Sequence, residues 1–414
     1  MENGVRFNFI KNNKFKTSMI GVFFSTPMTN ENVSVNALIP AVLRRGTKNF
    51  PTMREISKKL ESLYGAKFDC GVSKKGENQI IRFYGEAVNK KYTGSNQDTL
   101  SELADLINDV IFNPILENGK FKADYVSQEK EQVKDIIESR KNDKVQYALE
   151  RCYELMFENE PFGLCEFGTI EGIDSVSDDA LINAYKNMLN HYQVDVVVSG
   201  DLTEDEYNSI ISKFNFSQRK SLKIEAPAKV NVKKVRDYTE KFDINQGKLS
   251  LGYRVNIDAN SDDYYKVLVY NGILGGGVQS KLFQNVREKN SLAYYAFSRY
   301  EKIKSIMGIS CGIEIPNHQK ALDTILEQVE DMKNGKITEY EYETTLKTIE
   351  NSLNSMRDEQ DQMLDFNYTQ ILLGNERTLE EIIENVKKVQ IKDVVDVAKF
   401  VELDTIYFMT GNEE

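Results

Sequence analysis

Patterns of apolar and polar residues along the chain predict strands and helices in a repeated order. Apolar and polar residues alternate from Val5 to Phe24 and again from Lys241 to Val255, as in strands that bury one face. Between Leu100 and Ile111 apolar residues recur every three or four positions, which predicts a core-facing helix that stops at Asn113-Pro114.

The end of the first half of the chain repeats at the end of the second half. IEGIDSVSDDALINAY, which starts at Ile170, aligns without gaps with IENVKKVQIKDVVDVA, which starts at Ile383. Each is followed by a strand-like segment, VDVVVSGD closing at Asp201 and TIYFMTGN closing at Asn412. These features predict an α+β fold with two homologous domains, each a mainly antiparallel sheet packed with helices on one side.

The length and one polar segment predict where the domains divide. A chain of 414 residues is long enough for two domains of ordinary size. Apolar periodicity fades over residues 215–238, which are polar and basic and read as a surface linker. We therefore expect an N-terminal domain at 1–214 and a C-terminal domain at 239–414, and we ascribe the linker's charges to solvation rather than to a binding patch.

Net charge and cysteine usage limit the classes of binding partner and the cellular compartment that we expect for this protein. The net charge of −11, from 53 basic and 64 acidic residues, argues against nucleic acid and anionic membrane surfaces and leaves a peptide or cationic partner. The four cysteines are scattered without a Cys-x-x-Cys pair, as expected for free thiols in a reducing compartment. Because neither a secretory signal nor a membrane-spanning run is visible, we expect a cytoplasmic protein, and its many Lys, Asn and Ile residues fit a bacterial source.

The segment NALIPAVLRRGT, from Asn36 to Thr47, has the frame of a zinc-protease helix without its catalytic side chains. It resembles the pitrilysin and mitochondrial-processing-peptidase family of inverzincins, whose signature is His-x-x-Glu-His followed by an apolar, basic stretch and Gly-Thr. The resemblance places the two histidines on Ala37 and Ala41 and the general-base glutamate on Pro40. Since none of these residues has a side-chain ligand atom, we expect no metal here. Taken alone, the segment equally fits a core helix of an unrelated protein.

Proline at this place also affects the predicted helix. Pro40 lacks a backbone N–H and clashes with the preceding turn, which costs about 3 kcal/mol inside a helix. We therefore expect the helix to start at Pro40 or to bend around it.

The resemblance implies a third zinc ligand, a glutamate seven residues after another acidic residue on a later helix. Glu131 and Glu138 fit this spacing and place Glu138 at the ligand position. One carboxylate does not hold zinc where about three protein ligands are needed, so an exposed helix surface or an ion pair is the favoured interpretation. His191 and His318, the only histidines, lie far from this helix in sequence, and no Gly-x-Ser-x-Gly elbow or Cys-His pair suggests a nucleophile.

The segment LGGGVQSKLFQNVREKNSLAYYAFS, residues 274–298, is very similar to the second-domain motif of the same family. There an arginine and a tyrosine seven residues apart face the substrate, and they match Arg287 and Tyr294. Arginine can hold peptide carbonyls, and a tyrosine hydroxyl can donate to an oxyanion. The alternative is a helix-terminal arginine and a core tyrosine beside a glycine helix cap. The glycine run permits close backbone approach and consists of Gly275, Gly276 and Gly277.

Three functions follow from these observations. The first is a non-catalytic subunit of a zinc metalloendopeptidase, which by the resemblance forms a chamber around a peptide or unfolded polypeptide with an active paralogue. Zinc is then expected only in that partner, and a homodimer is a further possibility. The second is a peptide-binding or scaffold protein with no role in proteolysis. The third, an independently active peptidase, is disfavoured because the metal-binding side chains are missing.

Overall fold

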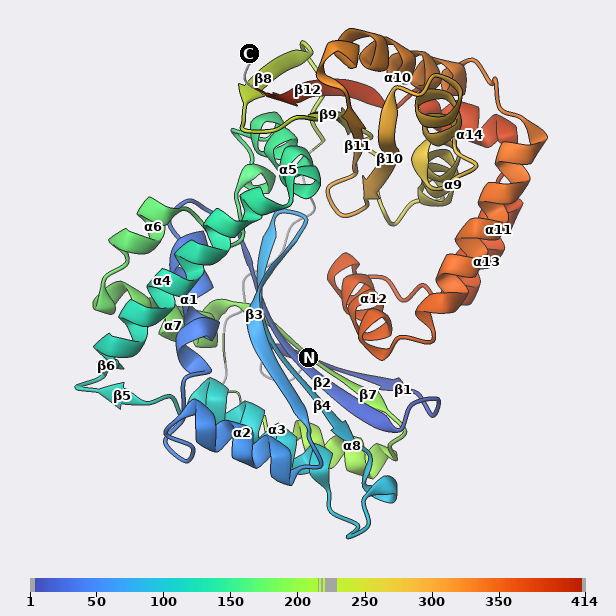
Figure 1. Ribbon diagram of the computed structural model, residues 1–414. Helices are drawn as coiled ribbons and strands as arrows, with labels where there is room; N and C mark the ends of the chain where they lie inside the picture. Colours follow the sequence, from blue (N-terminus) through green and yellow to red (C-terminus); the bar gives the residue numbers. More distant parts are fainter. Residues whose placement is uncertain (1–3, 215, 217–218, 220–228, 412–414) are drawn as a thin grey trace. The chain divides into compact units, whose positions relative to one another are not determined.

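The computed structural model describes residues 4–214, 216, 219 and 229–411 (Figure 1). Half of the predicted linker, residues 215, 217–218 and 220–228, lies outside the described part. The chain forms two compact units. Their boundaries do not follow a single cut of the sequence, because each unit also contains a short segment from the other half of the chain. Unit 1 comprises Met1–Ser139, Leu164–Glu225 and Gln360–Tyr368, and unit 2 comprises Arg140–Gly163, Ala226–Glu359 and Thr369–Glu414.

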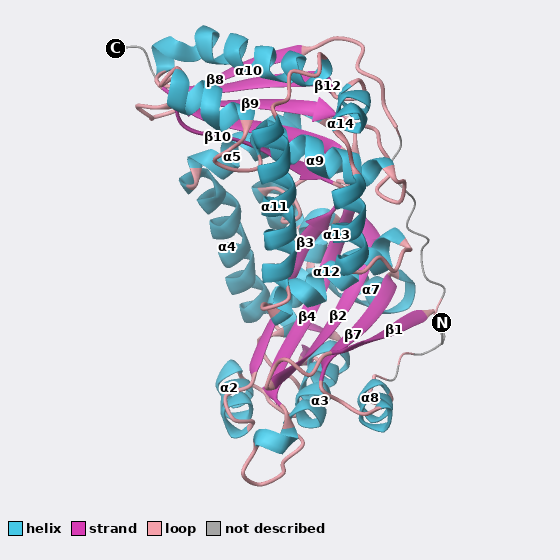
Figure 2. Cartoon of the chain, turned by 90° about the vertical axis from the view of Figure 1, so that its right-hand side faces the viewer, coloured by secondary structure: helices cyan, strands magenta, loops and turns pink. Residues whose placement is uncertain are grey.

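Unit 1 is built on a five-stranded sheet in the order β1-β7-β2-β4-β3, visible as neighbouring strands in Figure 2. Only β1 and β7 run parallel, and the other pairs are antiparallel. A separate two-stranded ribbon joins β5 and β6. The bounds are β1 (Val5–Lys11), β2 (Thr17–Pro27), β3 (Lys67–Lys75), β4 (Asn78–Val88), β5 (Leu116–Glu117), β6 (Lys120–Phe121) and β7 (Gln193–Gly200).

Helices cover one face of this sheet and share its core. Phe24 and Phe83 project from the strands to meet Leu38, Leu103 and Tyr185 of the helices. The helix predicted at 100–111 is present as α3 and is stopped at Asn113. The helices are α1 (Val33–Leu43), α2 (Met53–Ser62), α3 (Thr99–Phe112), α4 (Ala123–Ser139), α6 (Ile170–Ser175), α7 (Asp178–His191) and α8 (Glu204–Ile211), with a short helix η1 (Lys90–Tyr92).

The opposite face of the unit 1 sheet is partly covered by α12 (Gln360–Leu373), which comes from the second half of the sequence. The Tyr368 ring stacks on Phe23 with a centroid separation of 3.8 Å. The Tyr368 hydroxyl is 2.7 Å from Ser25 Oγ. Because Phe23 and Ser25 alternate with the core residue Phe24, they lie on the face opposite the main helical layer.

Unit 2 repeats the same sheet order, β8-β12-β9-β11-β10. Its strands β8 and β12 are parallel, and the remaining pairs are antiparallel, as in unit 1. Strand β12 therefore corresponds to β7, which matches the repeat found in the sequence. The bounds are β8 (Arg236–Lys241), β9 (Gly247–Arg254), β10 (Ala293–Glu301), β11 (Ile306–Ile313) and β12 (Glu402–Thr410).

Helices cover both faces of the unit 2 sheet, as in unit 1. His318 at the start of α10 stacks on Phe408, at 4.0 Å between ring centroids. The neighbouring residue Tyr407 instead packs against Ala148 and Cys152 of α5, which comes from the first half of the sequence. The helices are α5 (Lys144–Met156), α9 (Asp263–Gly275), α10 (His318–Lys333), α11 (Glu339–Met356), α13 (Leu379–Lys388) and α14 (Ile391–Ala398), with short helices η2 (Arg140–Asn142), η3 (Pro161–Gly163), η4 (Phe283–Lys289) and η5 (Ile315–Asn317).

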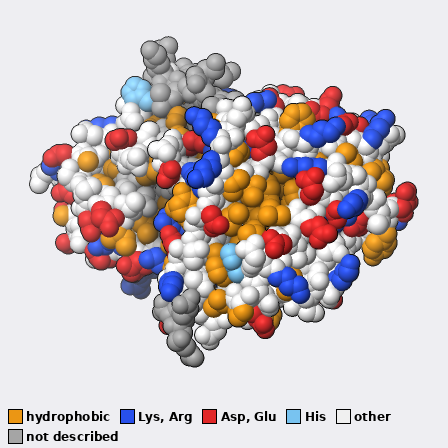
Figure 3. Space-filling model, turned by 90° about the horizontal axis from the view of Figure 1, so that it is seen from above, with side chains coloured by type: hydrophobic (Ala, Val, Ile, Leu, Met, Phe, Trp, Pro, Cys, Tyr) orange, Lys and Arg blue, Asp and Glu red, His pale blue; other side chains and the backbone are white. Residues whose placement is uncertain are grey.

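The predicted fold class is confirmed: two sheets of mainly antiparallel strands are each packed with helices. The structure adds a helix on the second face of each sheet: the part of α12 from Gln360 to Tyr368 in unit 1 and α5 in unit 2. Charged side chains of both signs are interspersed on the face shown in Figure 3, so the net negative charge is not gathered into one patch there.

Candidate functional site

Helix α1 carries the positions where the family's zinc ligands would stand. The helix begins at Val33, so the expectation that it starts at Pro40 was wrong. It continues through Pro40, as the hydrogen bond from Arg44 N to Pro40 O at 3.2 Å shows. Ala37 and Pro40 are buried and Ala41 is half-buried. These side chains offer no lone pair to a metal ion, so the residues do not fit zinc.

Buried side-chain amides hold the start of α1 by hydrogen bonds. Asn36 Nδ2 donates to Gln79 Oε1 at 2.9 Å, and the Tyr192 hydroxyl donates to Asn36 Oδ1 at 2.9 Å. Gln79 Nε2 also donates to the Val33 carbonyl at 2.9 Å. Burial raises the pKa of the Tyr192 hydroxyl, which stays neutral and keeps its proton for Asn36. This network fixes the part of α1 next to Ala37.

Helix α4 has acidic residues at two starting points for the seven-residue spacing, Glu131 and Glu129. Glu131 and Glu138 are both exposed, and Glu131 pairs with Lys134 at 2.8 Å. Glu129 is buried instead and forms an ion pair with Arg45, which follows α1. Seven residues after Glu129 stands Ile136, whose side chain is 43% exposed although it is apolar.

Helical geometry decides which α4 residues share a side. Seven residues make about two turns, so Ile136 lies on the same side of α4 as Glu129. Nine residues make about two and a half turns, so Glu138 points to the opposite side. The buried positions Val126, Glu129 and Val133 were a signal in the sequence for this face, because their spacing of three and four residues marks a packed helix stripe.

No alternative metal cluster takes the place of this site in the residues that the structure describes. Among them, no group of three or more His, Cys, Asp or Glu side chains is arranged to hold a metal ion. His191 is exposed, and His318 is engaged with Phe408. Cys70, Cys152 and Cys311 are buried free thiols, and the Cys70 thiol of β3 donates a hydrogen bond to Pro40 O at 3.2 Å.

In unit 2, Arg287 and Tyr294 lie on adjoining elements, the π-helix η4 and strand β10. The Arg287 side chain is 43% exposed, stacks on Phe283 at 4.6 Å and has a weak contact with Glu288 at 3.5 Å. Tyr294 is 52% exposed and sits where the pairing of β10 with β11 shifts register, between Ala293 and Tyr295. Such a bulge re-aims a side chain, and here it turns Tyr294 outward.

The glycine run has a packing function that is visible in the structure. A Cβ atom on Gly275 would lie 2.3 Å from the Ser298 backbone nitrogen, so α9 can approach β10 closely only with glycine at this place. A Cβ on Gly276 would lie 2.7 Å from Gly272 Cα. At Gly277 the nearest atom belongs only to the Gln279 side chain, at 2.7 Å. Two of the three glycines are therefore explained by packing.

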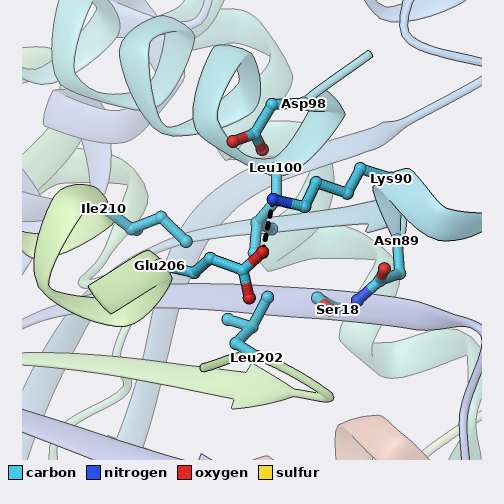
Figure 4. Close-up of a pocket in the computed structure, with 8 residues that line it drawn as sticks. All are labelled: Ser18, Asn89, Lys90, Asp98, Leu100, Leu202, Glu206 and Ile210. Carbon is cyan, nitrogen blue, oxygen red and sulfur yellow. Dashed lines mark ion pairs between the residues drawn. The ribbon is translucent and has the colours of Figure 1, made fainter. Parts of the chain in front are cut away.

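A small pocket in unit 1 is too confined for a peptide (Figure 4). Its volume of ≈ 10 Å³ is room for about one water molecule. The Lys90–Glu206 ion pair crosses it, and the hydrogen bond that the Lys90 ammonium donates to Glu206 raises the pKa of Lys90. The pocket is lined by Ser18, Asn89, Lys90, Asp98, Leu100, Leu202, Glu206 and Ile210.

The fold and these positions define a class: a two-unit metallopeptidase-like protein with Ala37 and Ala41 where the resemblance expects the two zinc-binding histidines. Residues 175–349 match the family described as Peptidase M16 inactive domain. The chain is 34% identical over 414 residues to the Probable inactive metalloprotease YmfF of Bacillus subtilis (strain 168), covering 99% of this chain and 96% of that protein. The chain therefore belongs to the peptidase M16 family, the resemblance found in the sequence, as an inactive, metalloprotease-like member.

Solved structures show the same fold. A conserved protein from Enterococcus faecalis V583 matches with a TM-score of 0.93 and 32% identity, over 100% of this chain and 98% of that one. The periplasmic protease PqqL from Escherichia coli matches with a TM-score of 0.73 and 15% identity, over 99% of this chain but 44% of PqqL. Among the described residues, no helix combines the length and the apolarity needed to span a membrane.

Proposed function

We propose that this chain is the non-catalytic subunit of a zinc metalloendopeptidase and forms a peptide-processing chamber with an active paralogue. The observation that carries the proposal is a contrast between the two units. The positions that the resemblance assigns to the two zinc-binding histidines carry Ala37 and Ala41, and the third position is Glu138 as first expected or Ile136 in the register of buried Glu129. Unit 2 instead keeps an exposed arginine and an outward-turned tyrosine that its packing does not require.

The chemistry available to Arg287 and Tyr294 suits a peptide that is cleaved by another subunit. Arg287 has donors to spare for peptide carbonyls, since its only ionic contact among the described residues is a weak one. The exposed Tyr294 hydroxyl can donate to the carbonyl oxygen that becomes negative as water attacks. Hydrolysis itself would depend on zinc bound by the partner.

The coverage of the PqqL match also supports a two-part chamber. This chain corresponds to less than half of that protease, so the PqqL polypeptide is long enough for two such chains. We infer that a paralogue supplies the second part here. The buried free thiols Cys70, Cys152 and Cys311 support a reducing, cytoplasmic location.

The test is reconstitution with a paralogue that carries an intact His-x-x-Glu-His. The peptidase activity of the mixture is measured on a quenched fluorescent peptide without stable structure. We expect Tyr294→Phe to lower kcat about 100-fold, the usual effect of losing an oxyanion donor. Arg287→Ala should chiefly raise KM. Lys289→Ala, an exposed cation on the same helix, is the matched control and should change neither constant.

Two results would reject the proposal. The first is full activity of the paralogue without this chain. The second is unchanged activity in both the Arg287 and the Tyr294 variants while complex formation is retained.

A peptide-binding or scaffold protein without a role in proteolysis is the second candidate. It is consistent with the amide network of Asn36, Gln79 and Tyr192, which holds the start of α1 by hydrogen bonds within the chain. In that case the chain binds unfolded peptide, and adding the paralogue produces no cleavage that depends on Arg287.

A further inference from the structure

Arg287 lies on a helix of an unusual kind. The helix η4 is a π-helix over Phe283–Lys289, whereas the two residues before it, Lys281 and Leu282, are α-helical. Such π-segments are rare, and they are frequent at functional sites. The contacts that keep η4 in this form therefore bear on what Arg287 can reach.

The wider turn changes the direction of the Arg287 side chain. A π-turn takes up about one residue more than an α-turn, and one residue corresponds to about 100° around the helix axis. If η4 relaxed to an α-helix, Arg287 would therefore turn by up to about 100°. In the π register its Cζ atom lies 4.6 Å from the centroid of the Phe283 ring, an arrangement that cation–π attraction favours.

Asn285 anchors the middle of η4. Its Nδ2 atom donates to Gln328 Oε1 of α10 at 2.7 Å and to the Lys281 carbonyl at 3.1 Å. Gln328 is buried, and Asn290 Nδ2 donates to the Asn285 carbonyl at 2.7 Å. The Asn285 amide thus bonds both to the preceding turn and to a neighbouring helix. Because hydrogen bonds are directional, these contacts specify one rotation of η4 about its axis.

A buried ion pair fixes the residues that lead into η4. Lys281 Nζ lies 3.1 Å from Glu341 Oε1, and the two side chains are 6% and 12% exposed. The other carboxylate oxygen of Glu341, Oε2, accepts a hydrogen bond from Thr338 N at 2.8 Å, at the start of α11. The entry to η4 is therefore tied to α11, and its middle is tied to α10.

Arg287 takes its direction from this helix. Among the described residues, its side chain has polar or ring contacts only with Glu288 and Phe283, which both belong to η4. We infer that Asn285 is a positioning residue, which together with Gln328 keeps η4 in the π register and so directs Arg287 toward the peptide. The inference rests on the proposed function, because it names what aims an arginine that would bind substrate.

The experiment is a double-mutant cycle in the reconstituted peptidase. Asn285→Leu combined with Gln328→Met replaces both partners of one bond by apolar side chains of similar shape, which changes stability little. We expect this pair of substitutions to raise KM about three- to tenfold with kcat nearly unchanged, because Arg287 loses its direction. In an Arg287→Ala background the same pair should change KM by less than about twofold, since no guanidinium remains to be positioned.

Asn385→Leu is the matched control. Asn385 is half-buried like Asn285, and its Nδ2 also donates to the carbonyl four residues earlier, Glu381 O at 2.9 Å, but it lies on α13. This substitution should leave KM unchanged with and without Arg287. Thermal unfolding midpoints verify that every variant is folded.

A second measurement needs no paralogue. The chain has no tryptophan, so Phe283→Trp introduces a single fluorophore beneath Arg287. Adding the Asn285 and Gln328 substitutions should shift its emission to longer wavelength, because the ring loses the cover of the guanidinium. Adding Asn385→Leu should leave the emission unchanged.

Two results would overturn the inference. One is an unchanged emission maximum in the chain with the Asn285 and Gln328 substitutions. The other is a raised KM in Arg287→Ala together with the same fold-change from the Asn285 and Gln328 pair with and without Arg287. Failure of the proposed function is distinct, since Arg287→Ala then leaves KM unchanged and the emission measurement alone decides the positioning role of Asn285.

Discussion

A buried ion-pair network in unit 2 makes a quantitative prediction. Asp404 of β12 accepts hydrogen bonds from Arg254 Nε at 2.7 Å, Arg236 Nη2 at 2.6 Å and Thr405 Oγ1 at 2.8 Å. The side chains of Asp404 and Arg254 are only 6% and 5% exposed. The substitution Asp404→Asn keeps the shape of the side chain and removes its charge.

The magnitude follows from the bonds that asparagine cannot replace. Hydrogen bonds to charged groups contribute about 1.5–3 kcal/mol each, and the side-chain carbonyl of the substituted asparagine can still accept one of them. Arg254 keeps a second partner, Glu160, at 2.6 Å, which limits the cost of leaving its charge unpaired. We therefore expect the substitution to lower the free energy of unfolding of unit 2 by about 2–4 kcal/mol. Removing one partner of a fully isolated buried pair costs about 3–5 kcal/mol.

Hydrogen exchange measured by mass spectrometry can assign this loss to one unit. Peptides from β9 and β12 should lose protection, whereas peptides from β2 and β4 should not. Asp396→Asn is the control, because Asp396 is 65% exposed and pairs with Lys399 on the surface, where solvent screening leaves an ion pair little effect on stability. A loss below about 1 kcal/mol at Asp404, or an equal loss at Asp396, would refute the reasoning.

The same carboxyl predicts how stability depends on pH. Burial alone would raise the pKa of Asp404, but hydrogen bonds from Arg236 and Arg254 outweigh it and hold the pKa below its usual value. A lowered pKa in the folded state stabilises the protein above the unfolded pKa of about 3.9, and this stability is lost as the pH falls through the lower value. Unfolding midpoints of wild type and Asp404→Asn should therefore converge below about pH 4, and a constant difference down to about pH 2 would contradict the assignment.

Two further predictions concern the candidate site. Ala37→His combined with Ala41→His and Ile136→Glu should give a chain that binds one zinc ion, detected by elemental analysis after dialysis, whereas the two histidines with α4 unchanged should not. Gly275→Ala should lower the free energy of unfolding by about 1–3 kcal/mol because its Cβ meets backbone, and Gly277→Ala should change it by less than about 0.5 kcal/mol. Chemical denaturation distinguishes the two glycines, and equal effects would contradict their assigned roles.

The fold was predictable because its signals are local. Apolar patterns mark β2 and β9, and helical spacing marks α3, so each element follows from nearby residues. The expectation that these strands bury one face was wrong, because β2 and β9 are buried on both faces. The aligned repeats place β7 and β12 at equivalent positions, which the sheet orders confirm. The exchange of α5 and α12 could not be read in this way, since both helices have ordinary helical patterns and only tertiary packing decides which sheet they cover.

The candidate site was harder to predict from the sequence, again because tertiary packing decides which side of each element is buried. Spacing of seven residues fits both Glu131 with Glu138 and Glu129 with Ile136, and the choice between them depends on which side of α4 is buried. The outward direction of Tyr294 depends on a register shift against β11, which a single strand does not reveal. Sequence patterns therefore identified the segments, and the side of each element came from its packing.

The candidate-site residues of the two units differ in what they contribute to the stability of the fold. Side chains that pack in the core occupy the α1 positions where the family has polar ligands, so these side chains stabilise the fold of unit 1. Arg287 and Tyr294 contribute little to the stability of unit 2, because both are exposed and neither has a strong partner among the described residues. Truncating them should therefore leave unfolding of the isolated chain unchanged. If their loss still impairs the reconstituted peptidase, their effect must come from contact with a peptide or a partner subunit and not from support of the fold.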